Sequence, residues 1–247
     1  MIDLAGRHIL IVGGSRGIGA ASARRCAALG ARVSLTYRAE AAKAEALARE
    51  IGGVALACDV ADERQVDAAT DGAVARCGEL RGVVISAGIF EHRAIEAMTV
   101  DFWERTMATN LRGTMLAIRA ARRHLGHGRG GSIVIYTSTA GQSGGGGGSA
   151  AYCVSKAGQI MLAKCMAHEL APLAVRVNCV APAWTETDMA AASLEKLGRE
   201  KVAASFPLGR IGQPGDVADA TAFLLSDAAS FITGTTVTVD GGIVMRG

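Results

Sequence analysis

Short apolar runs alternate along the chain with longer stretches in which apolar residues recur at three- and four-residue steps. The short runs are rich in β-branched residues and predict strands at His8–Val12, Arg32–Tyr37, Val54–Cys58, Val83–Ser86, Ser132–Thr137, Val175–Val180 and Thr236–Val239. Strands this apolar, separated by helices, are typical of a parallel sheet covered on both faces. The pattern predicts an α/β fold with a doubly wound sheet, in which ligands bind at the carboxyl ends of the strands.

The longer stretches have the helical period. Phe102, Trp103 and Met107 are followed by further apolar residues at helical steps, and the stretch after Tyr152 repeats the pattern, so one face of each helix is predicted to be core. Residues 183–214 break this alternation and are predicted to form a lid that contacts substrate. No linker or repeat interrupts the sequence, so residues 1–247 are predicted to be one domain of the Rossmann type.

Composition restricts the class of partner. Half of the 247 residues are hydrophobic, and Lys and Arg exceed Asp and Glu by 26 − 23 = 3 without forming a basic block. This distribution disfavours a nucleic-acid or membrane surface and favours a small-molecule partner. The six cysteines form no C-x-x-C pair and are predicted to be reduced, in a cytoplasmic protein. The first apolar run is too short for a membrane span or a signal-peptide core.

A glycine-rich turn follows the first predicted strand and opens the first helix. It reads Gly13-Gly14-Ser15-Arg16-Gly17-Ile18-Gly19, with the spacing G-x-x-x-G-x-G. Glycines let the backbone approach a pyrophosphate, and the helix N-terminus offers free N–H groups and a positive dipole. The turn therefore predicts a dinucleotide site.

The end of the second predicted strand indicates which dinucleotide binds. It reads Thr36-Tyr37-Arg38, without the carboxylate that would hold a ribose hydroxyl. Arg38 and Arg16 could instead converge on a 2′-phosphate, which favours NADP(H) over NAD(H). The alternative for Arg38 is a solvated surface cation. Asp59 could accept a hydrogen bond from the adenine amino group, or could simply cap a helix.

Tyr152 and Lys156 are four residues apart in a predicted helix, after Ser138. This spacing places both side chains on one face, one turn apart. A free tyrosine has a pKa near ~10, and a nearby ammonium is expected to lower it, making the phenol usable for acid/base catalysis on an alcohol or ketone. An ordinary surface pair is the alternative when the two residues are considered without the glycine turn.

The histidines do not favour a metal site. His124 and His127 are at helical spacing but have arginines around them and no suitable third ligand nearby. A solvated helix end is the preferred interpretation, and no catalytic metal is predicted.

In combination, these motifs resemble the short-chain dehydrogenase/reductase family from the first strand to Gly242. The ordered series comprises the glycine turn, Asp59-Val60, Ala87-Gly88, Asn110, Ser138, Tyr152 with Lys156, Asn178 with Pro182, and Asp240-Gly241-Gly242. Pro207-Leu208-Gly209-Arg210 and Ile232-Thr233-Gly234 are similar to the 3-oxoacyl-[acyl-carrier-protein] reductase branch, although many sugar, polyol and ketone reductases share them.

The resemblance implies roles for individual residues. Tyr152 would be the acid/base, Ser138 would bind the substrate oxygen, Lys156 would tune Tyr152 and hold the nicotinamide ribose, and Asn110 would anchor a water-borne proton relay. The implied cofactor-binding residues are Gly13, Ser15, Arg16, Gly17, Ile18, Gly19, Arg38, Asp59, Val60, Ala87, Gly88, Tyr152, Lys156, Pro182, Thr185 and Thr187. Gln142, Trp184, Met189 and Phe206 are expected to contact substrate.

Several positions depart from the family pattern. Val12 replaces a threonine, Ile85-Ser86 replaces paired asparagines, and Ala183 replaces a glycine. These changes could weaken cofactor binding, but no catalytic position is lost. The run Gly144–Gly148 is unusual, and it is either a passive flexible connection or an adaptable pocket wall.

The leading hypothesis is an NADPH-dependent reductase that interconverts a ketone and a secondary alcohol, with 3-oxoacyl thioesters as one substrate class. The alternatives are an NAD(P)-dependent alcohol or polyol dehydrogenase and a catalytically silent nucleotide-binding protein. The resemblance also implies a homotetramer, with interfaces around residues 102–125 and 152–170 and at the C-terminal strand.

Overall fold

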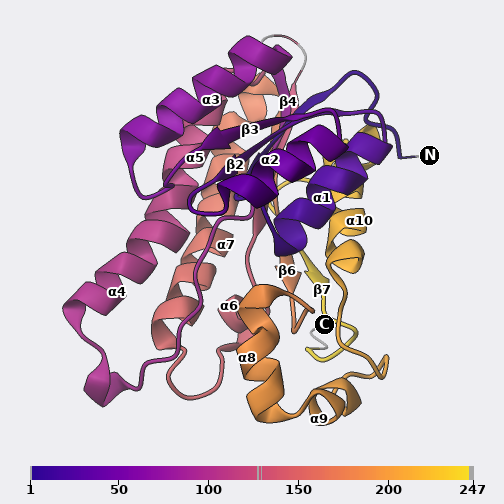
Figure 1. Ribbon diagram of the computed structural model, residues 1–247. Coiled ribbons are helices and arrows are strands. Elements are labelled where there is room, and N and C mark those ends of the chain that lie inside the picture. Colours follow the sequence, from indigo (N-terminus) through magenta and orange to yellow (C-terminus); the bar gives the residue numbers. More distant parts are fainter. Residues whose placement is uncertain (1, 127, 129, 245–247) are drawn as a thin grey trace.

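Parallel strands form a single sheet in the order β3-β2-β1-β4-β5-β6-β7 (Figure 1). The computed structural model describes residues 2–126, 128 and 130–244. Across these residues the strands are β1 His8–Val12, β2 Arg32–Tyr37, β3 Val54–Ala57, β4 Leu80–Ile85, β5 Gly131–Tyr136, β6 Val175–Pro182 and β7 Thr236–Val239. The predicted doubly wound α/β fold is confirmed. All seven predicted strands are present.

Strand boundaries differ from the prediction mainly in β4 and β6. β4 begins three residues early, at Leu80, because Leu80 pairs with His8 before a register shift in β1. Arg81 and Gly82 interrupt the apolar run, so the sequence pattern does not indicate that the strand begins at Leu80. β6 continues to Pro182 because its last two residues pair with β7. This extension carries the chain to the ligand-binding edge of the sheet.

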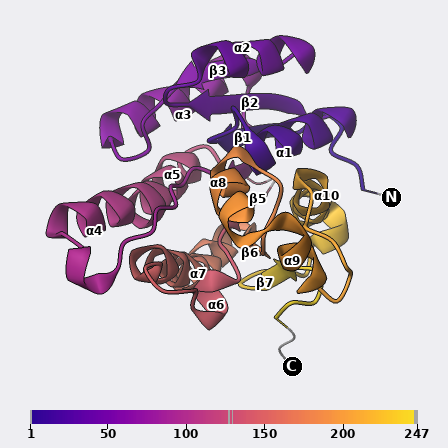
Figure 2. The ribbon, with the colours of Figure 1, turned by 60° about the horizontal axis from the view of Figure 1, so that its bottom comes forward.

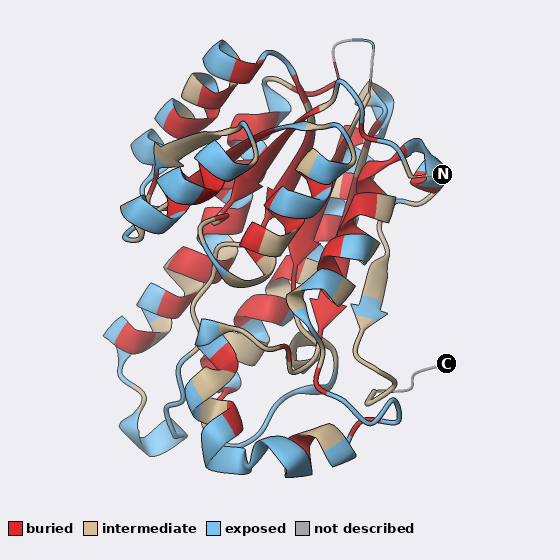
Figure 3. Cartoon of the chain, turned by 45° about the vertical axis from the view of Figure 1, so that its right-hand side comes forward, coloured by how far each residue is buried: buried red, intermediate tan, exposed pale blue. Residues whose placement is uncertain are grey.

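Helices cover both faces of the sheet (Figure 2). Their bounds are α1 Gly17–Ala28, α2 Ala41–Glu50, α3 Glu63–Cys77, α4 Val100–Met107, α5 Gly113–Arg122, α6 Ala140–Ser143, α7 Ala150–Leu170, α8 Asp188–Leu197, α9 Arg199–Ala204 and α10 Pro214–Leu225. One core cluster packs α3, α5 and α7 against the sheet, and the other packs α1, α2 and α10 against the opposite face. Buried residues accordingly concentrate in the strands and on the helix faces toward them (Figure 3).

Two local features position the site. A π-helical turn, Ala108–Arg112, joins α4 to α5 and contains Asn110. Such turns are rare and occur frequently at functional sites. The segment after β6 forms α8 and α9, which have a small core of their own containing Leu194, Val202 and Phe206. Within the described residues, no helix combines the length and apolarity needed to cross a membrane.

Candidate active site

A cleft of about 840 Å³ opens at the carboxyl ends of the strands. Its lining includes the turn after β1 and residues that follow β2, β3, β4, β5 and β6, together with parts of α7 and α8. β1 and β4 are neighbours in the sheet, and the strand order reverses between them. Ligands of doubly wound sheets bind at this kind of switch point. Every predicted catalytic or cofactor-binding residue lines the cleft except Gly19 and Asn110.

The glycine turn is shaped for close approach of a ligand to the backbone. Gly13 has φ +83°, and a Cβ there would lie 2.7 Å from the backbone of Ala87. Arg16 occupies the N-cap of α1 without a side-chain cap, so the helix N-terminus is available to an anion. Gly19 has a different role, because a Cβ there would lie 2.3 Å from the carbonyl oxygen of Gly13. It allows α1 to pack against the turn.

Main-chain and hydroxyl contacts hold this turn despite the departures from the family pattern. The carbonyl of Val12 accepts the N–H groups of Ser86 and Ala87, both at 2.9 Å. Thr36 on β2 accepts the Gly13 N–H at 3.0 Å. Because Val12 acts through its backbone, its side chain is not needed for these hydrogen bonds. The residues of the turn therefore fit a dinucleotide pyrophosphate.

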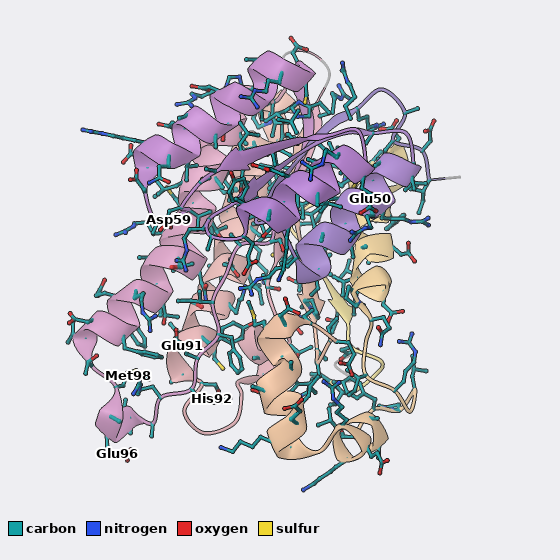
Figure 4. The ribbon with its side chains drawn as sticks, viewed as in Figure 1. Glu50, Asp59, Glu91, His92, Glu96 and Met98 are labelled. Atoms are coloured by element: carbon teal, nitrogen blue, oxygen red, sulfur yellow. The ribbon has the colours of Figure 1, made fainter. Side chains whose placement is uncertain are left out.

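Arg16, Arg38 and Asp59 line the end of the cleft beyond β2 and β3. Arg38 Nη1 lies 4.0 Å from Asp59 Oδ2, and the Arg38 side chain is 62% exposed. A weak, exposed ion pair leaves the guanidinium free to reorient toward a phosphate. Asp59 accepts the Ala61 N–H, whereas Asp62 caps α3. The helix-capping alternative for Asp59 is therefore wrong. Figure 4 labels Asp59 after β3.

The other end of the cleft contains Ser138, Tyr152 and Lys156. Ser138 follows β5, while Tyr152 and Lys156 lie on consecutive turns of α7. Lys156 is buried, and its ammonium donates to the carbonyl of Tyr136 at 2.7 Å. Its Nζ lies 5.6 Å from the centroid of the Tyr152 ring. The sequence prediction that these three side chains share one site is in agreement with this geometry.

The expected lowering of the Tyr152 pKa is wrong for this structure. Burial raises the pKa of Tyr152 to about 12, although a hydrogen bond with Ser138 lowers it in part. Burial likewise lowers the pKa of Lys156 to about 8. Desolvation is the largest cause of the Tyr152 shift, and the Lys156 ammonium is directed to a main-chain carbonyl. The phenol is consequently protonated at neutral pH.

Asn110 is a buried clamp between three segments. Its side chain accepts the N–H of Ile89 at 2.8 Å and donates to the Ile89 carbonyl and to Ser155 Oγ, both at 3.0 Å. Its main-chain carbonyl accepts from Thr114 Oγ1 and from Gln159 Nε2. These contacts tie the π-turn to α7 and to the loop after β4. The relay role of Asn110 stays a prediction.

The substrate side of the cleft includes residues that the sequence did not suggest. Phe90 lies with its ring centroid 4.8 Å from that of Tyr152, 4.7 Å from His92 and 6.5 Å from Trp184. All four line the cleft, as does Met189. Phe90 and His92 stand within four residues of Gly88, which is the signal that could have identified them. Figure 4 labels His92 in the loop that follows β4.

Two expected pocket residues lie elsewhere. Phe206 is buried in the small core of α8 and α9, and Gln142 hydrogen-bonds to Thr238 at 3.2 Å. Neither belongs to the cleft lining.

Gln159 was also missed. It is a fully buried polar residue on α7 that holds the Asn110 carbonyl at 2.8 Å, and its polar character on a buried helix face was the available signal.

Pro182, Thr185 and Thr187 line the cleft after β6. Thr187 caps α8 by accepting the Ala190 N–H, and Thr185 donates to the Ala183 carbonyl at 3.0 Å. This segment therefore has a defined conformation beside the glycine turn, where a Cβ at Gly17 would lie 3.4 Å from the Thr187 side chain.

Among the described residues, no group of three or more His, Cys, Asp or Glu side chains is arranged to hold a metal ion. His124 contacts Asp71 at 2.7 Å. His127 lies outside the described residues.

Comparisons with known proteins agree with this geometry. A family model described as "Enoyl-(Acyl carrier protein) reductase" matches residues 12–244. The chain is 37% identical over 244 residues to the 3-oxoacyl-[acyl-carrier-protein] reductase FabG of Staphylococcus aureus, covering 97% of this chain and 98% of the relative. It is 35% identical over 248 residues to the D-threitol dehydrogenase of Mycolicibacterium smegmatis, covering 98% and 95%.

A solved structure has the same fold. The crystal structure of a dehydrogenase/reductase from Sinorhizobium meliloti superposes with a TM-score of 0.92 at 37% identity, covering 99% of this chain and 97% of that one. The similarity thus spans the glycine turn, the residues around Tyr152 and the segment after β6.

Proposed function

Because the chain belongs to the short-chain dehydrogenase/reductase family, whose members use NAD(P)(H) as oxidoreductases, we propose that it reduces a ketone to a secondary alcohol with NADPH. The observation that carries the proposal is the convergence of Ser138, Tyr152 and Lys156 with the glycine turn in one cleft. 3-Oxoacyl thioesters are one candidate substrate class, in line with the name of the Staphylococcus aureus relative.

The proposed residues have complementary roles. Held by the glycine turn, Arg16 and Arg38, NADPH would supply a hydride to the carbonyl carbon, and negative charge would develop on the carbonyl oxygen. Tyr152 donates its proton to that oxygen, and Ser138 donates a hydrogen bond where the charge develops. Lys156, held by the Tyr136 carbonyl, keeps a positive charge near the phenol and can contact the nicotinamide ribose. Solvent then returns the proton to Tyr152.

The protonated state of Tyr152 is the one that ketone reduction requires. With its pKa raised to about 12, the phenol is present as a proton donor throughout the neutral range. Oxidation of an alcohol would require the phenolate, which burial disfavours. The D-threitol dehydrogenase relative supports polyol oxidation as a second candidate function.

A turnover panel tests the proposal. Purified protein should oxidise NADPH, followed at 340 nm, in the presence of at least one ketone among acyl thioesters, cyclic ketones and sugars. The reverse assay uses NADP⁺ or NAD⁺ with secondary alcohols and polyols. Turnover of polyols alone would replace ketone reduction by the second function. Binding of NADPH without turnover of any compound would support a silent nucleotide-binding protein.

We propose NADPH rather than NADH because Arg16 and Arg38 line the cleft and no carboxylate ends β2. Arg38→Ala is expected to weaken NADPH binding about ten- to hundredfold, the usual contribution of a charged hydrogen bond, and to leave NADH binding nearly unchanged. Titration of cofactor fluorescence measures both constants. Arg49→Ala is the matched control, since Arg49 is an exposed residue of α2 outside the lining. Equal losses for both cofactors would contradict the assignment.

We further propose that residues 183–214 form a lid over the substrate, because Met189 and Leu197 of α8 face the cleft.

We also propose that the enzyme is a cytoplasmic homotetramer. A cytoplasmic location is in line with the cysteines of the described chain, which are free thiols. Met115, Val154 and Met161 are exposed apolar residues on α5 and α7, as expected for helices that pack against another subunit. Sedimentation at assay concentration is expected to give a tetramer, and a stable monomer would contradict this.

A further inference from the structure

Aromatic rings surround the side chain of Tyr152. Phe90 meets Tyr152 edge to face, with an interplanar angle of 68°, and makes similar contacts with His92 and Trp184. All four rings belong to the lining of the cleft. Ring edges and faces of this kind attract other rings, because edge-to-face and offset pairs are favourable beyond their buried area. A carbonyl that accepts a proton from Tyr152 would therefore lie beside surface suited to an aromatic or cyclic group.

A wall without side chains adjoins this aromatic surface. Gly144–Gly147 line the cleft through their backbone, and a Cβ on Gly146 or Gly147 would meet no atom within 4 Å. The wall is tied to the aromatic side, because the Arg93 N–H, next to His92, donates to the Gly148 carbonyl at 2.7 Å. Gly146 and Gly147 are exposed, so this part of the lining is open and leaves room for a bulky group.

The aromatic side of the cleft offers mainly apolar surface. Phe90, Trp184 and Met189 line it, and Ser149 Oγ is already bonded to the Gly146 carbonyl at 2.5 Å. The hydroxyls of a polyol placed against these apolar side chains would lose water without gaining partners from them, which is costly.

We propose that the preferred substrates are ketones with a bulky apolar ring, aryl or cycloalkyl, next to the carbonyl. The ring would pack on Phe90 and Trp184 and extend over Gly146 and Gly147. This inference rests on the proposed ketone reduction and specifies its substrate class. It also assigns the glycine run as an adaptable pocket wall, the second of its two interpretations.

The test compares acetophenone, butan-2-one and a 3-oxobutanoyl thioester as substrates with NADPH. In the wild type, kcat/KM for acetophenone should exceed that for each of the other two by at least about tenfold, from the additional apolar surface buried. Gly146→Leu should lower kcat/KM for acetophenone by at least about tenfold and change that for butan-2-one less than about twofold. Gly146 does not have positive φ, so leucine is compatible with its backbone.

Gly215→Leu is the matched control. Gly215 also lacks positive φ and has open space around a Cβ, but it lies in α10 outside the lining, so both rates should be unchanged. Ketone turnover in which the thioester or butan-2-one is preferred, or an equal effect of Gly146→Leu on both ketones, would overturn the ring proposal alone. Failure of every ketone would instead overturn the proposed function. Thermal unfolding of each variant verifies that it is folded.

Discussion

Tyr152→Phe is expected to lower kcat/KM for ketone reduction by about 10²- to 10⁴-fold, the range that general acid catalysis contributes. The substitution removes the proton donor and retains the ring that packs against Phe90. The glycine turn and Arg38 are untouched, so NADPH binding should change little. Steady-state kinetics and cofactor fluorescence measure the two quantities separately.

Tyr37→Phe provides the matched control for this prediction. Tyr37 ends β2 and lines the same cleft, but at the end that contains Arg38. Loss of its hydroxyl should leave kcat within about twofold of the wild type, because a group remote from developing charge does not stabilise the transition state. If Tyr152→Phe retained wild-type turnover, a different group would have to protonate the substrate.

The fold was largely predictable because its strands are buried on both faces. Ile9 and Ile11 belong to a run that is continuously apolar from Ile9 to Val12, and such runs are visible without knowledge of tertiary contacts. Boundaries were harder to predict where pairing overrides composition, as at Leu80 and Pro182. The π-turn around Asn110 has no distinctive local pattern, since Asn110 is held by hydrogen bonds to Ser155 and Gln159 of the distant helix α7.

The candidate site was predictable where chemistry depends on local spacing. The glycine turn and the Tyr152–Lys156 pair each lie within a single strand–helix or helical segment, and the structure places them as the spacing indicates. Trp184 was expected in the pocket and lines the cleft. Its contact with Phe90 could not be predicted in this way, because the two residues come from separate loops and meet only in the folded chain. The direction of the Tyr152 pKa shift was missed for a related reason. It depends on burial, which is a property of the whole fold.

Lys156→Met is expected to reduce turnover by about 10²-fold or more while costing little stability at neutral pH. The ammonium is buried, and burial lowers its pKa to about 8 from the ordinary 10.5. A charge held in this way destabilises the folded state by about 3 kcal/mol below pH 8. The variant loses this penalty, but it also loses the hydrogen bond to the Tyr136 carbonyl, which contributes about 1.5 to 3 kcal/mol. The two changes nearly cancel.

The pH dependence of the free energy of unfolding separates the burial penalty of the ammonium from the contribution of its hydrogen bond. Between pH 8 and 10.5 the unfolded wild type binds more protons than the folded protein, because its lysine has the higher pKa. The free energy of unfolding of the wild type should therefore rise relative to that of Lys156→Met, by about 3 kcal/mol across the whole window. Urea unfolding at fixed protein concentration measures the difference, and comparison of the two proteins cancels the titration of the buried cysteines other than Cys179, whose pKa Lys156 lowers.

Lys164→Met is the control, because Lys164 lies on the same helix but is exposed. It should change neither turnover nor the pH dependence of stability. A difference between wild type and Lys156→Met that stays flat from pH 8 to 10.5 would show that the ammonium carries no burial penalty. A rising difference together with lost turnover would mean that the fold keeps a destabilising charge because the reaction requires it.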